Sequence, residues 1–113
     1  MTPRVEILYW DGCPSHPRAL ADLRAALTDV SLDPDAIDVI EIRDDADAAR
    51  EHFTGSPTVR IDGRDVVPSP GEPVQLACRV YRRRDGRISP VPDPDDLRDA
   101  LRRALTSPEG ATP

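Results

Sequence analysis

Hydrophobic positions along the first third of the chain change from strand spacing to helical spacing. The run Val5–Trp10 is short, β-branched and aromatic, which is typical of a buried strand. A turn cluster follows at residues 11–15, and leucines then recur at helical spacing, which predicts a helix from about Ser15 to Asp29. Ser15 can cap this helix, and Pro17 suits its first turn.

The middle of the chain predicts a second strand, a short helix and a hairpin. Residues 37–42 alternate as a strand does, and Asp44 and Asp45 can cap a helix over residues 46–53. The third strand is expected at residues 58–61. The pair Asp62–Gly63 is a strong hairpin-turn signal, and it leads into a further strand at residues 65–67.

The last third predicts a second extended segment and a final helix. After an irregular loop at residues 68–73, the alternation of Leu76, Cys78 and Val80 predicts that these three side chains face inward. The segment 76–81 reaches a turn at Asp85–Gly86 and returns through Arg87–Ile88. The last helix is expected to start at Asp93–Pro94 and to present an apolar face made by Leu97, Leu101, Ala104 and Leu105.

This order of elements predicts an α/β protein with a small mixed β-sheet. Strand, helix and strand in the first half form a βαβ unit, which requires a parallel strand pair. The hairpin then adds antiparallel strands to the same sheet, and helices cover its faces. A chain of 113 residues has room for one domain, expected at residues 1–106, followed by a flexible tail at 107–113.

Composition and charge exclude several classes of function. No apolar run approaches the roughly 20 residues of a membrane-spanning helix, and no secretory signal is visible, so a cytoplasmic location is expected. The net charge of −6 opposes sequence-independent binding of nucleic acid. The chain contains no lysine, which excludes Schiff-base chemistry. Without a phosphate loop, a zinc-type cysteine pair or a Ser-His-Asp signature, no cofactor is expected.

The residue with the strongest chemical signal is Cys13, at the junction between the first strand and the first helix. Unpaired N–H groups and the dipole at a helix N-terminus favour an anion, so a thiolate here has a lowered pKa. Polar neighbours on both sides of Cys13 favour an exposed, functional thiol over a buried hydrophobe. His16 follows in the first helical turn, where it either stabilises the thiolate or lies exposed on the surface.

Cys78 is the other cysteine, and two cysteines are too few for a disulfide-stapled secreted mini-protein. Two free thiols in a reducing cytoplasm are the default expectation, although one internal bridge is possible. Cys78 is either a core residue or, if its segment folds back over Cys13, a resolving thiol.

Ser56, Pro57 and Thr58 form the third signal. A proline that enters a strand directly after Gly-Ser is a plausible site for a cis peptide bond, although a trans proline is the common state. Trp10 lies beside Cys13 and either shapes a substrate groove or closes the edge of the core.

Taken together, the strand order, the cysteine at the first strand–helix junction and the Gly-Ser-Pro-Thr entry into the third strand resemble the thioredoxin-like superfamily. The segment 59–64 resembles the hairpin that follows the cis-proline in glutaredoxins. This resemblance implies that Cys13 is the attacking thiol at an exposed site, with Pro57 packed opposite it and Ser56 offering backbone hydrogen bonds. The chain departs from the family at His16, which stands where the Cys-x-x-Cys motif has its second cysteine.

The function that this resemblance implies is thiol-dependent redox chemistry on a protein or small-molecule thiol or disulfide, without nucleic acid or membrane. Cys13 would form a mixed disulfide, and Cys78 or an external thiol would resolve it. The Cys78–Tyr81 segment also resembles small proteins labelled alkylmercury lyase-like, in which Cys13 and Cys78 would bind a soft metal and Asp11, Asp62 or Asp65 would supply an acid. A third possibility is a thioredoxin-like interaction module without redox function.

Overall fold

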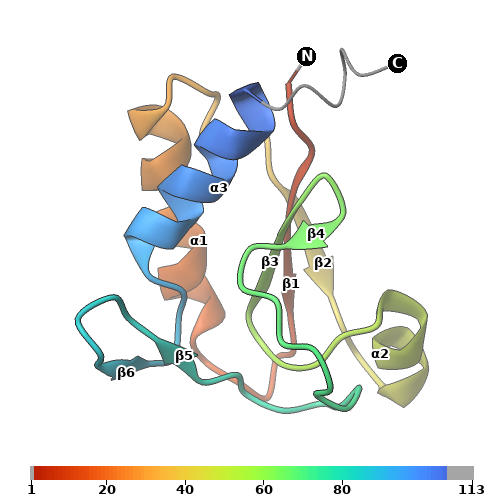
Figure 1. The fold of residues 1–113 in the computed structure, drawn as a ribbon. Helices are drawn as coiled ribbons and strands as arrows, with labels where there is room; N and C mark the ends of the chain where they lie inside the picture. The colour runs from red at the N-terminus through yellow and green to blue at the C-terminus, as the bar shows by residue number, and fades with distance from the viewer. Residues whose placement is uncertain (1, 107–113) are drawn as a thin grey trace.

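The computed structural model describes residues 2–106 and contains a four-stranded sheet, three helices and a separate hairpin (Figure 1). In chain order the elements are β1 (Val5–Tyr9), α1 (His16–Asp29), β2 (Asp38–Glu41), α2 (Asp45–Glu51), β3 (Thr58–Ile61), β4 (Arg64–Asp65), β5 (Tyr81–Arg82), β6 (Ile88–Ser89) and α3 (Pro94–Thr106). The expected tail at residues 107–113 lies outside the described residues.

The sheet is mixed, as the sequence predicts, with the strand order β2-β1-β3-β4. Strand β1 pairs in parallel with β2 and antiparallel with β3, and β3 continues antiparallel into β4. The predicted βαβ unit and the hairpin at Asp62–Gly63 are therefore both present. In the described part of the chain, no helix is long and apolar enough to cross a membrane.

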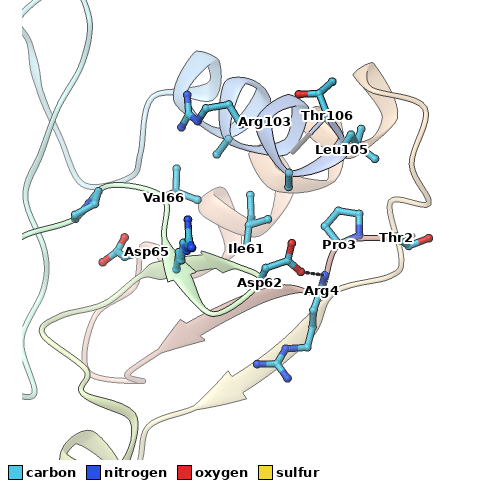
Figure 2. Close-up of a pocket in the computed structure, with 14 residues that line it drawn as sticks. Thr2, Pro3, Arg4, Ile61, Asp62, Asp65, Val66, Arg103, Leu105 and Thr106 are labelled. Carbon is cyan, nitrogen blue, oxygen red and sulfur yellow. Dashed lines mark hydrogen bonds between the residues drawn. The ribbon is translucent and has the colours of Figure 1, made fainter. Parts of the chain in front are cut away.

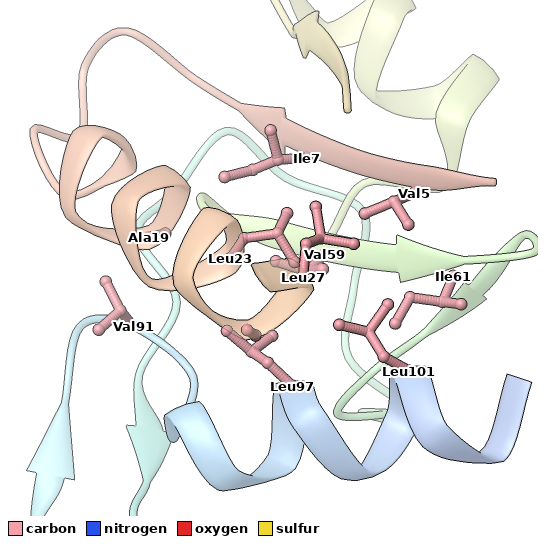
Figure 3. Packing of buried hydrophobic residues seen from close by; sticks show 11 residues of the cluster. Val5, Ile7, Ala19, Leu23, Leu27, Val59, Ile61, Val91, Leu97 and Leu101 are labelled. Carbon is pink, nitrogen blue, oxygen red and sulfur yellow. The ribbon is translucent and has the colours of Figure 1, made fainter. Parts of the chain in front are cut away.

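Helices α1 and α3 pack side by side on one face of the sheet, where the main core lies (Figures 1 and 3). Val5 and Ile7 of β1 face this core, while Leu8 points to the opposite face, as the alternation along a strand requires. A smaller cluster on that opposite face joins Leu8 to Phe53 and to Ala48 of α2. Strand β1 is thus buried on both faces, and even the charged Glu6 within it is only 9% exposed.

The β5–β6 hairpin does not join the main sheet and lies at the end where β1 finishes and α1 begins (Figure 1). Ion pairs connect its turn to α3. The Arg84 guanidinium lies 2.6 Å from the carboxylate of Asp99 and 2.8 Å from that of Asp96. The predicted turn at Asp85–Gly86 is present, but its strands are only two residues long.

Two details at the helices differ from the prediction. The Ser15 side chain makes no capping hydrogen bond at the start of α1, although proline stands in the first turn as expected. Leu105 was expected on the buried face of α3 but is 41% exposed, because it falls in the last turn, beyond Leu101, which is fully buried against the sheet.

Candidate functional site

A disulfide joins Cys13 and Cys78 across 65 residues of sequence, with the two Cα atoms 5.6 Å apart. This separation lies within the range that disulfide geometry requires. The default expectation of two free thiols is therefore wrong, and the internal bridge forms instead. The segment that carries Cys78 does fold back to the strand–helix junction that carries Cys13.

The two cysteines differ in exposure, which contradicts the predicted exposure of Cys13 and, of the two alternatives for Cys78, the core position. Cys13 is only 2% exposed, whereas Cys78 lies on the surface. Polar neighbours suggested an exposed Cys13, but the returning segment and the loop before Pro57 cover it. Cys78 and Val80 were expected to face inward, yet Val80 is 70% exposed, because Arg79 and Tyr81 occupy the inward positions.

Two polar groups of the chain lie close to the sulfur of Cys13. Its Sγ lies 3.8 Å from Oγ of Ser15 and 3.6 Å from the carbonyl oxygen of Ser56. The backbone N–H of Cys13 donates to the carbonyl of Trp10 at 3.0 Å, which closes the turn between β1 and α1. Because a disulfide sulfur carries no proton, the hydroxyl of Ser15 is the group that can donate in the first of the two sulfur contacts.

His16 occupies the first position of α1 and its ring stacks on Tyr9, with the ring centroids 4.0 Å apart. Its Nδ1 atom is buried and has no hydrogen-bond partner among residues 2–106. His16 therefore packs at the start of the helix as part of a stacked ring pair, and no hydrogen bond joins it to Cys13 in this part of the chain.

Ser56 is fully buried, and its polar groups are all used within the chain. Its N–H donates to the carbonyl of Ala77 at 2.7 Å, and its carbonyl accepts from the N–H of Arg79 at 2.8 Å. Its Oγ accepts from the backbone N–H of Trp10 at 3.0 Å. The backbone hydrogen bonds that Ser56 was expected to offer to a substrate are therefore made with the chain's own Cys78 segment.

The peptide bond between Ser56 and Pro57 is cis. Pro57 is fully buried, and Thr58 is 2% exposed with its hydroxyl bonded to the carbonyl of Gly55 at 2.6 Å. None of the expected groove residues 56–58 thus presents surface while the disulfide is closed. Trp10 is half-buried, packs against the smaller core cluster and covers Gly12.

The Cys78 segment runs parallel to the residues before Pro57. Gln75 donates its backbone N–H to Phe53 at 3.0 Å, and Ser56 forms an isolated parallel bridge with Cys78. Hydrogen bonds to residues before and after Cys78 therefore hold the segment beside the loop that precedes Pro57.

Arg79 anchors this segment, although its residue type and position in the sequence did not mark it as a site residue. Its buried guanidinium donates to the carboxylate of Asp65 at 2.7 Å and to the carbonyl of Val67 at 2.6 Å. The guanidinium carbon also lies 4.5 Å from the ring centroid of Tyr81, whose hydroxyl donates to the carbonyl of Pro57. Burial raises the pKa of Tyr81 above its usual value of 10.0.

The acids proposed for carbon–mercury chemistry do not gather at the cysteine pair. Asp65 is paired with Arg79, and Asp62 lies beyond the other end of β3, where it accepts the backbone N–H of Arg4 at 2.9 Å (Figure 2). Asp11 is exposed in the turn before Cys13. Among residues 2–106, no group of three or more His, Cys, Asp or Glu side chains is placed to hold a metal ion.

An open hollow of about 870 Å³ lies between the β3–β4 hairpin and the last turns of α3 (Figure 2). Ile61, Val66 and Leu105 supply apolar lining, and Arg4 and Arg103 lie at its edge. Neither cysteine lines it, so the hollow is separate from the disulfide.

The protein families, the curated proteins and the solved structures were each compared with this chain, and none of the three comparisons gave a match. The candidate site is therefore inferred from the residues of this chain alone. The site is a disulfide that joins a buried cysteine to an exposed one.

Proposed function

We propose that this chain is a thiol-disulfide redox protein whose working group is the Cys13–Cys78 pair. The observation that carries the proposal is the exposure of Cys78. Its disulfide partner, Cys13, lies at the N-terminus of α1. An exposed disulfide is accessible to thiols in solution, and access is one of the factors that set the rate of exchange.

The exchange needs no reactants other than the two sulfurs of the pair and two external thiols. A thiolate attacks one sulfur of the pair, the S–S bond breaks, and the other sulfur leaves as a thiolate. A second external thiolate then attacks the mixed disulfide. The pair is reduced to two thiols, and the two external thiols are oxidised to one disulfide. The reverse sequence reduces a disulfide substrate at the expense of the pair.

The finer assignments of fold and compartment are part of the same proposal. A thioredoxin-like fold is supported by the βαβ unit, by the cysteine before α1 and by the cis bond at Ser56–Pro57. We place the chain in the cytoplasm, where disulfides are usually transient and catalytic or redox-sensing. The partner is a thiol or disulfide, in a protein or a small molecule.

Turnover tests this proposal directly. The full chain is incubated with reduced glutathione and hydroxyethyl disulfide, and the rate of glutathione oxidation is compared with the uncatalysed rate. We expect acceleration that is lost in Cys78→Ser, while Ser69→Ala in the irregular loop retains it. A disulfide that stays closed in the folded chain under these conditions would contradict the redox function and favour a non-catalytic interaction module.

The same proximity of the two cysteines supports a second candidate, the binding of a soft metal ion by the reduced pair. Two thiolates are the ligands that soft metals prefer, and the Cα separation of 5.6 Å allows both to contact one ion. Titration of the reduced chain with mercuric ion tests it. One tightly bound ion per chain, lost in both Cys13→Ser and Cys78→Ser, supports metal binding, and weak binding that survives either substitution opposes it.

A further inference from the structure

We infer that Cys78 is the sulfur that forms the mixed disulfide and that Cys13 is the leaving and resolving sulfur. This inference rests on the proposed redox function and deepens it. It reverses the order expected from the sequence, in which Cys13 attacks and Cys78 resolves. The observation behind it is the difference in exposure between the two bonded cysteines, because Cys13 is 2% exposed and Cys78 is on the surface.

The direction of attack favours Cys78. A thiolate approaches a disulfide in line with the S–S bond, from the side opposite the leaving sulfur. An attack on Cys13 would have to reach a residue that is only 2% exposed, where the Ser15 hydroxyl and the Ser56 carbonyl lie within 3.8 Å of its sulfur. An attack on Cys78 comes from the exposed side of the segment, so solvent access selects this sulfur.

The surroundings of Cys13 suit a leaving thiolate. Cys13 precedes α1, a helix of 14 residues, whose N-terminus favours negative charge. Ser15 makes no side-chain cap for this helix, and its hydroxyl instead lies beside the Cys13 sulfur. A thiolate stabilised in this way leaves more readily, because leaving-group thiols with a lower pKa depart faster.

The anchored segment keeps the two sulfurs near each other after the bond opens. Cys78 is held on one side by the bond between Ala77 and Ser56, and on the other by Arg79, whose guanidinium is bonded to Asp65. When the reduced pair acts on a substrate disulfide, Cys78 attacks it and releases the first substrate thiolate. Cys13 then attacks Sγ of Cys78, which expels the second substrate thiolate and restores the Cys13–Cys78 bond.

The test uses the oxidised wild-type chain, so it does not depend on a variant that folds. The chain is mixed with reduced glutathione, quenched with acid and N-ethylmaleimide at short times, and mapped by mass spectrometry. We expect glutathione on Cys78 and maleimide on Cys13 in the first species to appear. Glutathione on Cys13, or equally on both cysteines, overturns the inference and leaves the redox function standing, whereas an unreactive folded chain overturns both.

A matched pair of variants gives a second measure. Cys13→Ser and Cys78→Ser each remove the same disulfide, so they differ mainly in which thiol remains. We expect the thiol of Cys13→Ser to react with 5,5′-dithiobis(2-nitrobenzoate) at least ~10-fold faster than that of Cys78→Ser, because reactivity depends on exposure. Equal rates, with both variants folded by circular dichroism, contradict the assignment.

Discussion

The side chain of Ser15 lies beside the Cys13 sulfur and does not cap helix α1. Serine before a helix usually accepts a backbone N–H, and replacing such a cap by alanine costs about 1 kcal/mol. Here the side chain makes no cap, and its Oγ lies 3.8 Å from the sulfur of Cys13. We interpret the hydroxyl as a positioning group for the Cys13 thiolate.

We therefore predict that Ser15→Ala slows thiol exchange while changing stability by less than the ~1 kcal/mol of a lost cap. The reason is that the Cys13 thiolate loses a donor, so its pKa rises and it leaves less readily. The measurement is the pH profile of Cys13 alkylation in the reduced chain, which should shift to higher pH. Ser15→Thr, which keeps a hydroxyl, should restore the profile, and an unchanged profile in Ser15→Ala would show that the hydroxyl plays no part.

Tyr81 carries a pH-dependent contribution to stability. Burial raises its pKa above 10.0, so the folded state binds this proton more tightly than the unfolded state does. Its stabilising contribution is fully present below pH 10 and is lost as the pH rises above that value. In Tyr9→Phe, which leaves Tyr81 as the one tyrosine, we predict that phenolate absorbance appears only as the alkaline chain unfolds.

Circular dichroism at matched pH supplies the comparison for Tyr81. Phenolate absorbance that develops near pH 10 while the far-ultraviolet spectrum stays native would contradict a buried, hydrogen-bonded hydroxyl. Tyr81→Phe should weaken the alkaline loss of stability, because the titrating group has been removed.

At the scale of elements, the buried side chain of Arg79 anchors the segment 75–81 in addition to its backbone hydrogen bonds and the disulfide. The side chain is 7% exposed, and its two terminal nitrogens bond different partners, Asp65 and the Val67 carbonyl. A lysine ammonium does not reproduce this planar fork. We predict that Arg79→Lys lowers the free energy of unfolding by about 2–3 kcal/mol, toward the range found when one partner of a buried ion pair is removed.

Arg87→Lys is the control for this prediction. Its side chain is 83% exposed and pairs with Asp85 on the surface, so its effect should stay within about 0.5 kcal/mol. Denaturant unfolding of the two variants in the oxidised form gives the comparison. Equal effects would mean that Arg79 is not what anchors the segment.

The elements of the sheet were predictable because their signals are local. A short β-branched and aromatic run marks β1, alternation marks β2, helical spacing marks α1 and α3, and the Asp62–Gly63 turn joins β3 to β4. The orientation of the segment 76–81 was not predictable in the same way. Its alternation fits two opposite registers, and the choice depends on partners for Arg79 that lie 12 to 21 residues away in the sequence.

The candidate site was predictable in part for the same reason. The sequence indicated Cys13 and Cys78 as candidate site residues, and it left open both isomers of the Ser56–Pro57 bond, which is cis. It did not indicate that Cys13 would be buried and Cys78 exposed, since burial depends on how the returning segment covers the strand–helix junction. It also assigned Ser56 to a substrate, although the segment's own backbone takes both of its peptide hydrogen bonds.

At the scale of the whole molecule, the disulfide links the start of α1 to the segment before the last helix. It closes a loop with a sequence separation of 65 residues. In the chain-entropy model, a cross-link of this length stabilises the folded state by about 4 kcal/mol. We predict that reduction lowers the free energy of unfolding by up to that amount and leaves the sheet and helices folded.

Denaturant unfolding with and without dithiothreitol measures this loss, and Cys13→Ala/Cys78→Ala serves as the reference for the reduced state. A loss close to the whole stability of the chain, with collapse of the helical spectrum on reduction, would indicate that the bond is structural. The proposed exchange instead requires a chain that is folded in both the disulfide and the dithiol form.

The most direct test of the redox account is therefore the opening of the disulfide in the folded chain. The oxidised chain is placed in glutathione buffers at several pH values, and the appearance of two thiols is followed by maleimide trapping and mass spectrometry, alongside circular dichroism. The account predicts that both thiols appear while the native spectrum is kept, faster as the pH rises and more glutathione is ionised. Thiols that appear only when denaturant unfolds the chain would contradict it.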